Sequence, residues 1–175
     1  MATTWVLLAG LPATGKSTLA RALAAQLKNA AVLDKDRVRE ALFPGAMTDY
    51  TPEQDNLCIR AMIEAAAYLT VHRLAEYIFF DGRTFSRNAH IEEVLAAADK
   101  AGAAWRILLL TCSDKVAEAR LQAADPNHPA RNRSIELYRS VKAAFEPISQ
   151  AKLELDTTAG IDTLLPSVLR FIAAT

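Results

Sequence analysis

The sequence predicts an α/β fold in which a parallel β-sheet is covered by helices on both faces. Short apolar runs, which predict strands, alternate with helical segments along the 175 residues. These runs lack strict alternation of polar and apolar residues, which indicates that both faces of each strand are buried, as in parallel sheets. The length suits one core and no internal repeat or linker interrupts it, so we expect a single domain over residues 1–175.

Each strand is predicted from a short apolar run and each helix from its periodicity or its terminal residues. The first strand ends at Gly10, and leucines every four residues mark one face of the helix that follows. A long helix is expected after Thr51, its N-cap, with Pro52 at its first position. In chain order the expected strands are 5–9, 31–33, 77–80, 104–110 and 152–155. The expected helices are 16–28, 36–42, 52–74, 89–101, 113–124, 134–145 and 161–174, with loops over 44–51 and 125–133. The aromatic residues expected in the core are Tyr68, Tyr77, Phe79 and Phe80.

Composition excludes several classes of function. Twenty basic residues balance twenty acidic ones, which argues against a general nucleic-acid or anionic-membrane binder. Cys58 and Cys112 lie far apart and in no metal-ligand spacing, as expected of free thiols in a reducing compartment. No apolar segment approaches the ~18 residues of a bilayer-spanning helix, and no signal peptide is apparent. We therefore expect a cytoplasmic protein without a membrane partner.

Residues 10–17, Gly-Leu-Pro-Ala-Thr-Gly-Lys-Ser, match the pattern G-x-x-x-x-G-K-[ST] between a predicted strand and a predicted helix. Glycines let backbone N–H groups surround an anion, and the helix N-terminus behind them adds positive potential. Lys16 would contact the β- and γ-phosphates and Ser17 would offer its hydroxyl to Mg²⁺. A chance glycine-rich turn is the alternative. The residues predicted to bind the triphosphate of a nucleotide are Leu11, Pro12, Ala13, Thr14, Gly15, Lys16, Ser17 and Thr18.

Two aspartates follow the second predicted strand, and Asp34 and Asp36 lie two residues apart. In extended geometry both would point to one side, which would face the phosphates if this strand lay beside the first. One carboxylate could then hold a water of the Mg²⁺ shell, and the other could accept the proton of an attacking hydroxyl. The alternative is an acidic helix start in which Asp34 or Asp36 is the N-cap.

From residue 5 to about 147 the chain resembles the small P-loop kinases. The resemblance rests on the phosphate loop, on Asp34-x-Asp36-x-x-Arg39, on a strand ending at Asp81 and on an arginine-bearing lid. The group includes shikimate, gluconate and adenylylsulfate kinases, chloramphenicol phosphotransferase, zeta toxins and polynucleotide kinase. It implies a P-loop NTPase three-layer α/β/α sandwich with a five-stranded parallel sheet of the nucleoside-kinase type. It also implies that Asp34 supports the metal, that Asp36 is the general base and that Arg39 binds the substrate.

Asp81 and two arginines follow the third predicted strand. A carboxylate at this position can order a Mg²⁺-bound water, whereas a simple Asp-Gly turn is the alternative. Arg83 and Arg87 follow at the carboxyl edge of the sheet, where open α/β folds bind ligands. We expect both to contact the phosphoryl acceptor, with an exposed helix-start residue as the alternative for Arg87.

A lid is expected over about 120–134, where Arg120, Arg131 and Arg133 flank or occupy a polar, proline-bearing loop. Mobile arginines that close over a transferring phosphate neutralise its charge and exclude water. We expect Arg131 to be catalytic and Arg120 to contact the nucleotide. A solvated basic loop is the alternative, and the R-x-x-x-R pair of many relatives is incomplete because Ala124 stands four residues after Arg120.

The acceptor-binding helices are expected over about 40–75. Residues 43–56 carry three acidic side chains and no lysine or arginine, which disfavours a long polyanion. The sequence thus predicts an ATP- and Mg²⁺-dependent kinase that phosphorylates a hydroxyl of a small molecule, as a monomer or homodimer without a nucleic-acid partner. The alternatives are a polynucleotide 5′-hydroxyl or nucleotide-sugar kinase, such as a zeta-like toxin, and a non-enzymatic nucleotide-binding regulatory module. The chain has no N-K-x-D element, so guanine specificity is not expected.

Overall fold

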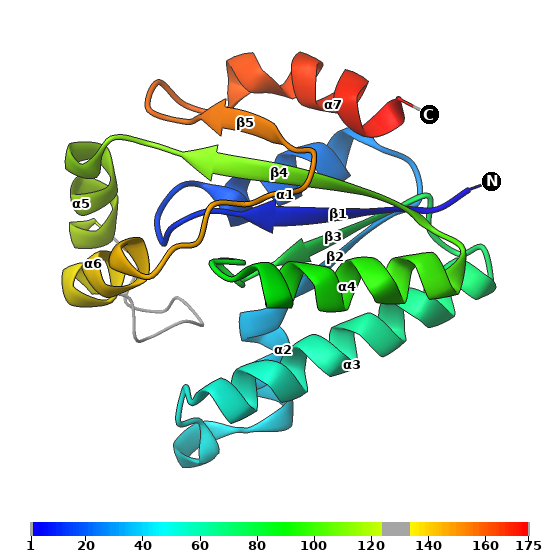
Figure 1. The fold of residues 1–175 in the computed structure, drawn as a ribbon, viewed down its shortest axis with the longest axis horizontal. Coiled ribbons are helices and arrows are strands. Elements are labelled where there is room, and N and C mark those ends of the chain that lie inside the picture. Colours follow the sequence, from blue (N-terminus) through cyan, green and yellow to red (C-terminus); the bar gives the residue numbers. More distant parts are fainter. Residues whose placement is uncertain (1, 124–133, 175) are drawn as a thin grey trace.

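The computed structural model describes residues 2–123 and 134–174, which form a parallel sheet between two layers of helices (Figure 1). Neighbouring strands are parallel throughout the order β2-β3-β1-β4-β5. The strands are β1 (Thr4–Ala9), β2 (Ala30–Asp34), β3 (Tyr77–Asp81), β4 (Ala104–Thr111) and β5 (Leu153–Asp156). The predicted three-layer sandwich with a five-stranded sheet is confirmed.

The helices begin and end close to their expected positions. They are α1 (Lys16–Gln26), α2 (Lys35–Leu42), α3 (Pro52–Val71), α4 (Asn88–Ala101), α5 (Asp114–Gln122), α6 (Ile135–Ala143) and α7 (Leu165–Ala173). The last helix begins later than predicted, because a 3-10 turn over Asp162–Leu164 precedes it and Pro166 occupies its first turn, where no N–H is needed. No helix in the described parts of the chain is long and apolar enough to cross a membrane.

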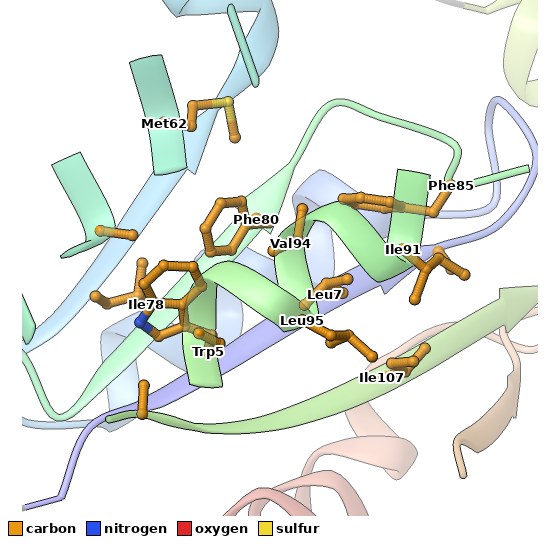
Figure 2. Close-up of a cluster of buried hydrophobic side chains, with 14 of the residues drawn as sticks. Trp5, Leu7, Met62, Ile78, Phe80, Phe85, Ile91, Val94, Leu95 and Ile107 are labelled. Carbon is orange, nitrogen blue, oxygen red and sulfur yellow. The ribbon is translucent and has the colours of Figure 1, made fainter. Parts of the chain in front are cut away.

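Strand β1 is buried from both sides of the sheet. Trp5 and Leu7 pack beneath α3 and α4, as Figure 2 shows, whereas Val6 and Leu8 pack beneath α1 and α7. All four side chains are fully buried, and burial of one such aliphatic side chain contributes about 2 kcal/mol. The indole Nε1 of Trp5 donates a hydrogen bond to Thr70 Oγ1 at 2.9 Å. This central strand therefore provides a rigid base for the loop that follows it.

One core prediction is wrong. Phe79 and Phe80 are fully buried and Tyr77 is half-buried, but Tyr68 is 59% exposed. The side of α3 that faces the sheet is formed by Met62, Ala66 and their neighbours one turn apart, so Tyr68 falls on the solvent side. There its ring packs against that of His72, with centroids 4.2 Å apart.

Candidate functional site

A cleft of about 900 Å³ lies beyond the carboxyl ends of the strands. Its walls are formed by the loop after β1 with the first turns of α1, the beginnings of α2 and α3, the segment after β3 with the start of α4, one residue of α5, two of α6 and the loop after β5. Parallel strands direct their following loops to the same edge of a sheet, and the strand arrows in Figure 1 point to this edge. Segments far apart in the sequence thereby line one site.

The loop after β1 has the backbone of an anion cradle. Gly10, Ala13 and Gly15 have positive φ values of 140°, 63° and 90°, and such a succession turns backbone N–H groups toward a common centre. Glycine is required at position 10, because a Cβ there would lie 2.3 Å from the carbonyl oxygen of Leu110. Lys16 directs its Nζ across the loop and donates to the carbonyls of Gly10 and Leu11, at 3.0 and 2.7 Å.

Most of the residues predicted to bind the nucleotide line this cleft. The residues of the loop that do so are Pro12, Ala13, Gly15, Lys16, Ser17 and Thr18. Two do not: Thr14 is buried and donates its hydroxyl to the Leu11 carbonyl at 2.9 Å, and Leu11 packs against a small apolar cluster that contains Leu121. These two residues shape the loop from behind.

A pair of residues from distant segments braces the loop. Arg120 Nη1 donates to Ala13 O at 3.2 Å and to Thr157 Oγ1 at 3.1 Å, and its Nη2 donates to Thr157 O at 2.7 Å. Thr157 is fully buried, and its hydroxyl also lies 2.9 Å from Thr14 O and 3.0 Å from Thr111 O. The sequence singled out Arg120 but not Thr157, which stands in an unremarkable Thr-Thr-Ala-Gly turn.

Asp81 and Ser17 form a place where Mg²⁺ would fit. The Asp81 carboxyl is buried at the end of β3 and forms a hydrogen bond with the Ser17 hydroxyl, while its Oδ1 has no partner among the described residues. Burial raises the pKa of Asp81, and Asp34 raises it further. The described residues contain no group of three or more His, Cys, Asp or Glu side chains that could hold a metal ion. Mg²⁺ usually keeps several waters and is bound through one or two carboxylates plus substrate phosphates.

The prediction that Asp34 and Asp36 share extended geometry is wrong. Helix α2 begins at Lys35, so Asp34 is its N-cap, and Asp34 Oδ1 accepts the backbone N–H groups of Asp36 and Arg37 at 2.9 and 3.4 Å. A helix start leaves N–H groups without intrahelical partners, and a short carboxylate satisfies them. The helix-start alternative therefore holds for Asp34. Its carboxylate nevertheless lies close enough to Asp81 to raise the pKa of that group, and its role toward the metal stays a prediction.

Asp36, in the first turn of α2, lines the same cleft as Lys16 and Ser17. Its Oδ1 accepts a hydrogen bond from Arg39 Nη1 at 2.9 Å and lies 3.6 Å from Lys35 Nζ. A spacing of three residues places Arg39 on the same face of the helix. Only 13% of the Asp36 side chain is exposed, so two cations hold this carboxylate in one orientation beside the phosphate cradle.

The sequence analysis did not single out Lys35 or Asp55, which complete this cluster. Asp55, near the start of α3, accepts from Lys35 Nζ at 3.0 Å and forms an ion pair with Arg39 Nη2. Burial lowers the pKa of Lys35 to about 8, although Asp36 opposes the shift. The guanidinium of Arg39 is almost fully buried and lies over the ring of Tyr50, 5.1 Å from its centroid. Arg39 therefore links α2 to α3 through the Asp55 carboxylate.

Arg83 and Arg87 both line the cleft, and their contact with the acceptor stays a prediction. Arg83 is only 6% exposed; its Nη2 donates to Asn56 Oδ1 at 3.0 Å, and its Nη1 has no partner among the described residues. Arg87 is exposed and occupies the N-cap position of α4, so the helix-start alternative also holds for it. His90 lines the cleft beside them, and burial lowers its pKa, with Arg83 and Arg87 adding to the effect.

The predictions for the lid and for the two cysteines remain to be compared with the structure. Residues 124–133, which include Arg131, Arg133 and most of the predicted lid, lie outside the part of the chain that the structure describes. Cys58 is buried and Cys112 is half-buried, and both are free thiols.

The sheet order, the phosphate cradle and the helix that follows it define a P-loop NTPase fold of the type found in small kinases. The chain belongs to the family described as AAA domain, whose model matches residues 6–148. No curated protein sequence matches the chain.

Several solved structures share this fold over nearly the whole chain. A candidate kinase from Chloroflexus aurantiacus is 21% identical, with 97% of this chain and 98% of that chain covered and a TM-score of 0.76. The APS kinase of Mycobacterium tuberculosis is 17% identical, with 99% of both chains covered and a TM-score of 0.70. A gluconokinase from Sinorhizobium meliloti is 12% identical, with 98% and 91% covered and a TM-score of 0.68. At such identities the likeness shows the fold alone.

Proposed function

We propose that this protein is an ATP-dependent kinase that transfers the γ-phosphoryl group to a hydroxyl of a small molecule. The observation that carries the proposal is that Asp36 lies in the same cleft as Lys16 and Ser17 and is held there by Arg39 and Lys35. Phosphoryl transfer needs alignment, charge neutralisation and a base close to the nucleophile. A phosphate cradle and a carboxylate that could serve as the base, that of Asp36, lie in one cleft. The fold that the chain shares with kinases also supports the proposed kinase activity.

The phosphate cradle would bind the triphosphate of ATP. Backbone N–H groups of the loop and the Lys16 ammonium would contact the β- and γ-phosphates, and Lys16 would then exchange its carbonyl partners for phosphate oxygens. Arg120 lines the cleft beside Gly15 and would contact the nucleotide. Ser17 and Asp81, with Asp34 close by, would hold Mg²⁺, which when bound neutralises phosphate charge.

Asp36 would act as the general base. As the acceptor oxygen bonds to the γ-phosphorus, the bond from that phosphorus to the bridging oxygen of ADP breaks, and the hydroxyl proton passes to the Asp36 carboxylate. Arg39 would act as a positioning residue, because its guanidinium already binds Asp36 and Asp55. The start of α3, within the expected region of about 40–75, and helix α2, most of which precedes that region, would form the wall of the acceptor pocket.

The substitution Asp36→Asn tests this assignment, because it keeps the shape of the side chain and removes the base. We expect Mg·ATP affinity, measured by calorimetry, to be unchanged, while transfer of the γ-phosphoryl group from labelled ATP to a panel of hydroxyl compounds falls about 10²–10⁴-fold. Asp99→Asn, an exposed position remote from the cleft, is the matched control. Near-normal transfer by Asp36→Asn would remove Asp36 from the role. Including RNA 5′-hydroxyl ends and nucleotide sugars in the panel tests the alternative acceptors.

A further inference from the structure

Arg83 is a buried cation that forms no ion pair with the residues that the structure describes; burial lowers its pKa, whereas Glu93 raises it but forms no ion pair with Arg83. Arg83 is only 6% exposed, and its one hydrogen-bond partner among the described residues is the neutral amide oxygen of Asn56. Its Nη1 has no partner in residues 2–123 and 134–174, and within these ranges Arg83 forms no ion pair. Burying a charge without a counter-ion costs free energy. A residue of this kind indicates a missing anionic partner.

The other cations in this part of the cleft differ from Arg83. Lys35 and Arg39 are each paired with the carboxylates of Asp36 and Asp55, so two positive charges face two negative ones. Arg83 and the exposed Arg87 have no such partners among the described residues, and both line the cleft. The acceptor end of the cleft therefore carries an excess of positive charge where these two arginines lie.

The segment that carries Arg83 is held in place on both sides. The backbone N–H of Gly10, at the start of the phosphate loop, donates to Thr84 O at 3.0 Å, and that of Glu146 donates to Ser86 O at 2.9 Å. Phe85 is fully buried in the core, with a positive φ of 50°. Arg83 is thus preorganised, which lowers the entropic cost of binding a ligand.

We propose that the phosphoryl acceptor carries, besides its hydroxyl, a compact oxyanion that Arg83 binds, with Arg87 closing over it from the surface. This inference rests on the proposed kinase function and names the substrate class for it: a hydroxylated carboxylate, phosphate ester or sulfate. A guanidinium recognises such groups through parallel N–H···O bonds, and Asn56 leaves the Nη1 of Arg83 available for them. A neutral acceptor would leave the buried charge unpaired.

The test measures anion binding at Arg83 with the nucleotide site filled. ¹⁵N-labelled protein is saturated with magnesium and a nonhydrolysable ATP analogue, and is then titrated separately with inorganic phosphate, sulfate and acetate. The Nε–H signal of Arg83, assigned by its absence in Arg83→Gln, should shift and saturate with at least one anion. A response to phosphate or sulfate indicates an acceptor that carries a phosphate or sulfate group, whereas a response to acetate indicates one that carries a carboxylate.

Affinity in the variants decides the point. The affinity for the anion is measured from the shifts of the backbone amides of residues 82–90. Arg83→Gln should bind the anion roughly tenfold to a hundredfold more weakly than the wild type. Arg73→Gln, an exposed position that does not line the cleft, should match the wild type. The proposal is overturned if none of the three anions gives a saturable shift in the protein that holds the analogue.

Stability gives an independent readout. A side chain placed for a ligand should not support the fold, so Arg83→Met should unfold at the same Tm as the wild type or a higher one. A fall in Tm as large as that of a core substitution such as Leu7→Ala would show a structural role and overturn the proposal. Failure of the proposed function is seen separately: amides of residues 10–17 would then not respond to the nucleotide analogue, while the Arg83 titration would still be readable.

Discussion

The brace between Thr157 and the phosphate loop predicts a defined loss of stability for Thr157→Val, which keeps the side-chain shape and removes the hydroxyl. This hydroxyl accepts a hydrogen bond from the Arg120 guanidinium and lies within bonding distance of two carbonyls, of which its single proton can serve one. A bond to a charged donor contributes about 1.5 to 3 kcal/mol and a neutral one about 1 kcal/mol. Together the two bonds come to about 2.5 to 4 kcal/mol. Because Arg120 keeps its bonds to Ala13 O and Thr157 O, we expect a loss at the lower end of this range, about 2.5 to 3 kcal/mol.

Urea unfolding, extrapolated linearly to water, measures this loss. The control is Thr158→Val, because that hydroxyl is exposed: it accepts the Ser113 N–H at 3.2 Å and hydrogen-bonds the exposed Asp156 carboxylate. Bonds at the surface compete with water, so a change under about 1 kcal/mol is expected there. The affinity of Thr157→Val for ATP should also fall, because the phosphate loop loses the hydrogen bond between the Thr157 hydroxyl and Thr14 O. A loss under about 0.5 kcal/mol at Thr157, or equal losses at both positions, would refute the reasoning.

Three further predictions concern the same cleft. The pKa of Lys35 is lowered from 10.5 to about 8, so between these two pH values the unfolded chain binds more protons than the folded one, and the free energy of unfolding should rise with pH by up to about 3 kcal/mol. Urea unfolding of Lys35→Met as a function of pH should lack this rise. A pH profile identical to that of the wild type would contradict the burial of Lys35. Asp34→Ala removes the N-cap of α2 and should lower the free energy of unfolding by about 1 kcal/mol, whereas Asp34→Asn, an equally good N-cap, should leave it almost unchanged. Equal losses for the two variants in thermal unfolding would exclude capping as the cause. Gly10→Ala should lower the free energy of unfolding by about 2 to 5 kcal/mol, because the new Cβ would lie 2.3 Å from Leu110 O. In the control Gly102→Ala the new Cβ has no atom within 4 Å. Comparable urea midpoints for the two variants would show that the contact with Leu110 O is unimportant.

The sequence predicted the fold well because its signals are local. Apolar runs mark strands that are buried on both faces, and the glycine-bearing loop after the first of them has a fixed pattern. Helix starts such as Thr51 with Pro52 are also local, and the structure places the helix there. Errors arose where a neighbour decides the outcome: Asp34 caps a helix that begins one residue earlier than expected.

The acceptor end of the site was less predictable. Arg39 was expected to bind the substrate, but a salt bridge to Asp55, sixteen residues away on another helix, could not be read from either segment alone. The buried state of Arg83 depends on how the segment after β3 is fixed to residues 10 and 146. Pairing of charges between distant segments and the burial of charges are tertiary properties, and no spacing pattern in one sequence encodes them.

The most direct test of the central claim is the fate of the γ-phosphoryl group. Protein with Mg²⁺ and γ-labelled ATP is incubated with a panel of hydroxyl compounds that carry a carboxylate, phosphate or sulfate group, beside neutral alcohols. The account predicts label in an organic product with an anionic acceptor, and loss of that product in both Lys16→Met and Asp36→Asn. Label found only as orthophosphate, at a rate unaffected by every acceptor and by Asp36→Asn, would contradict it.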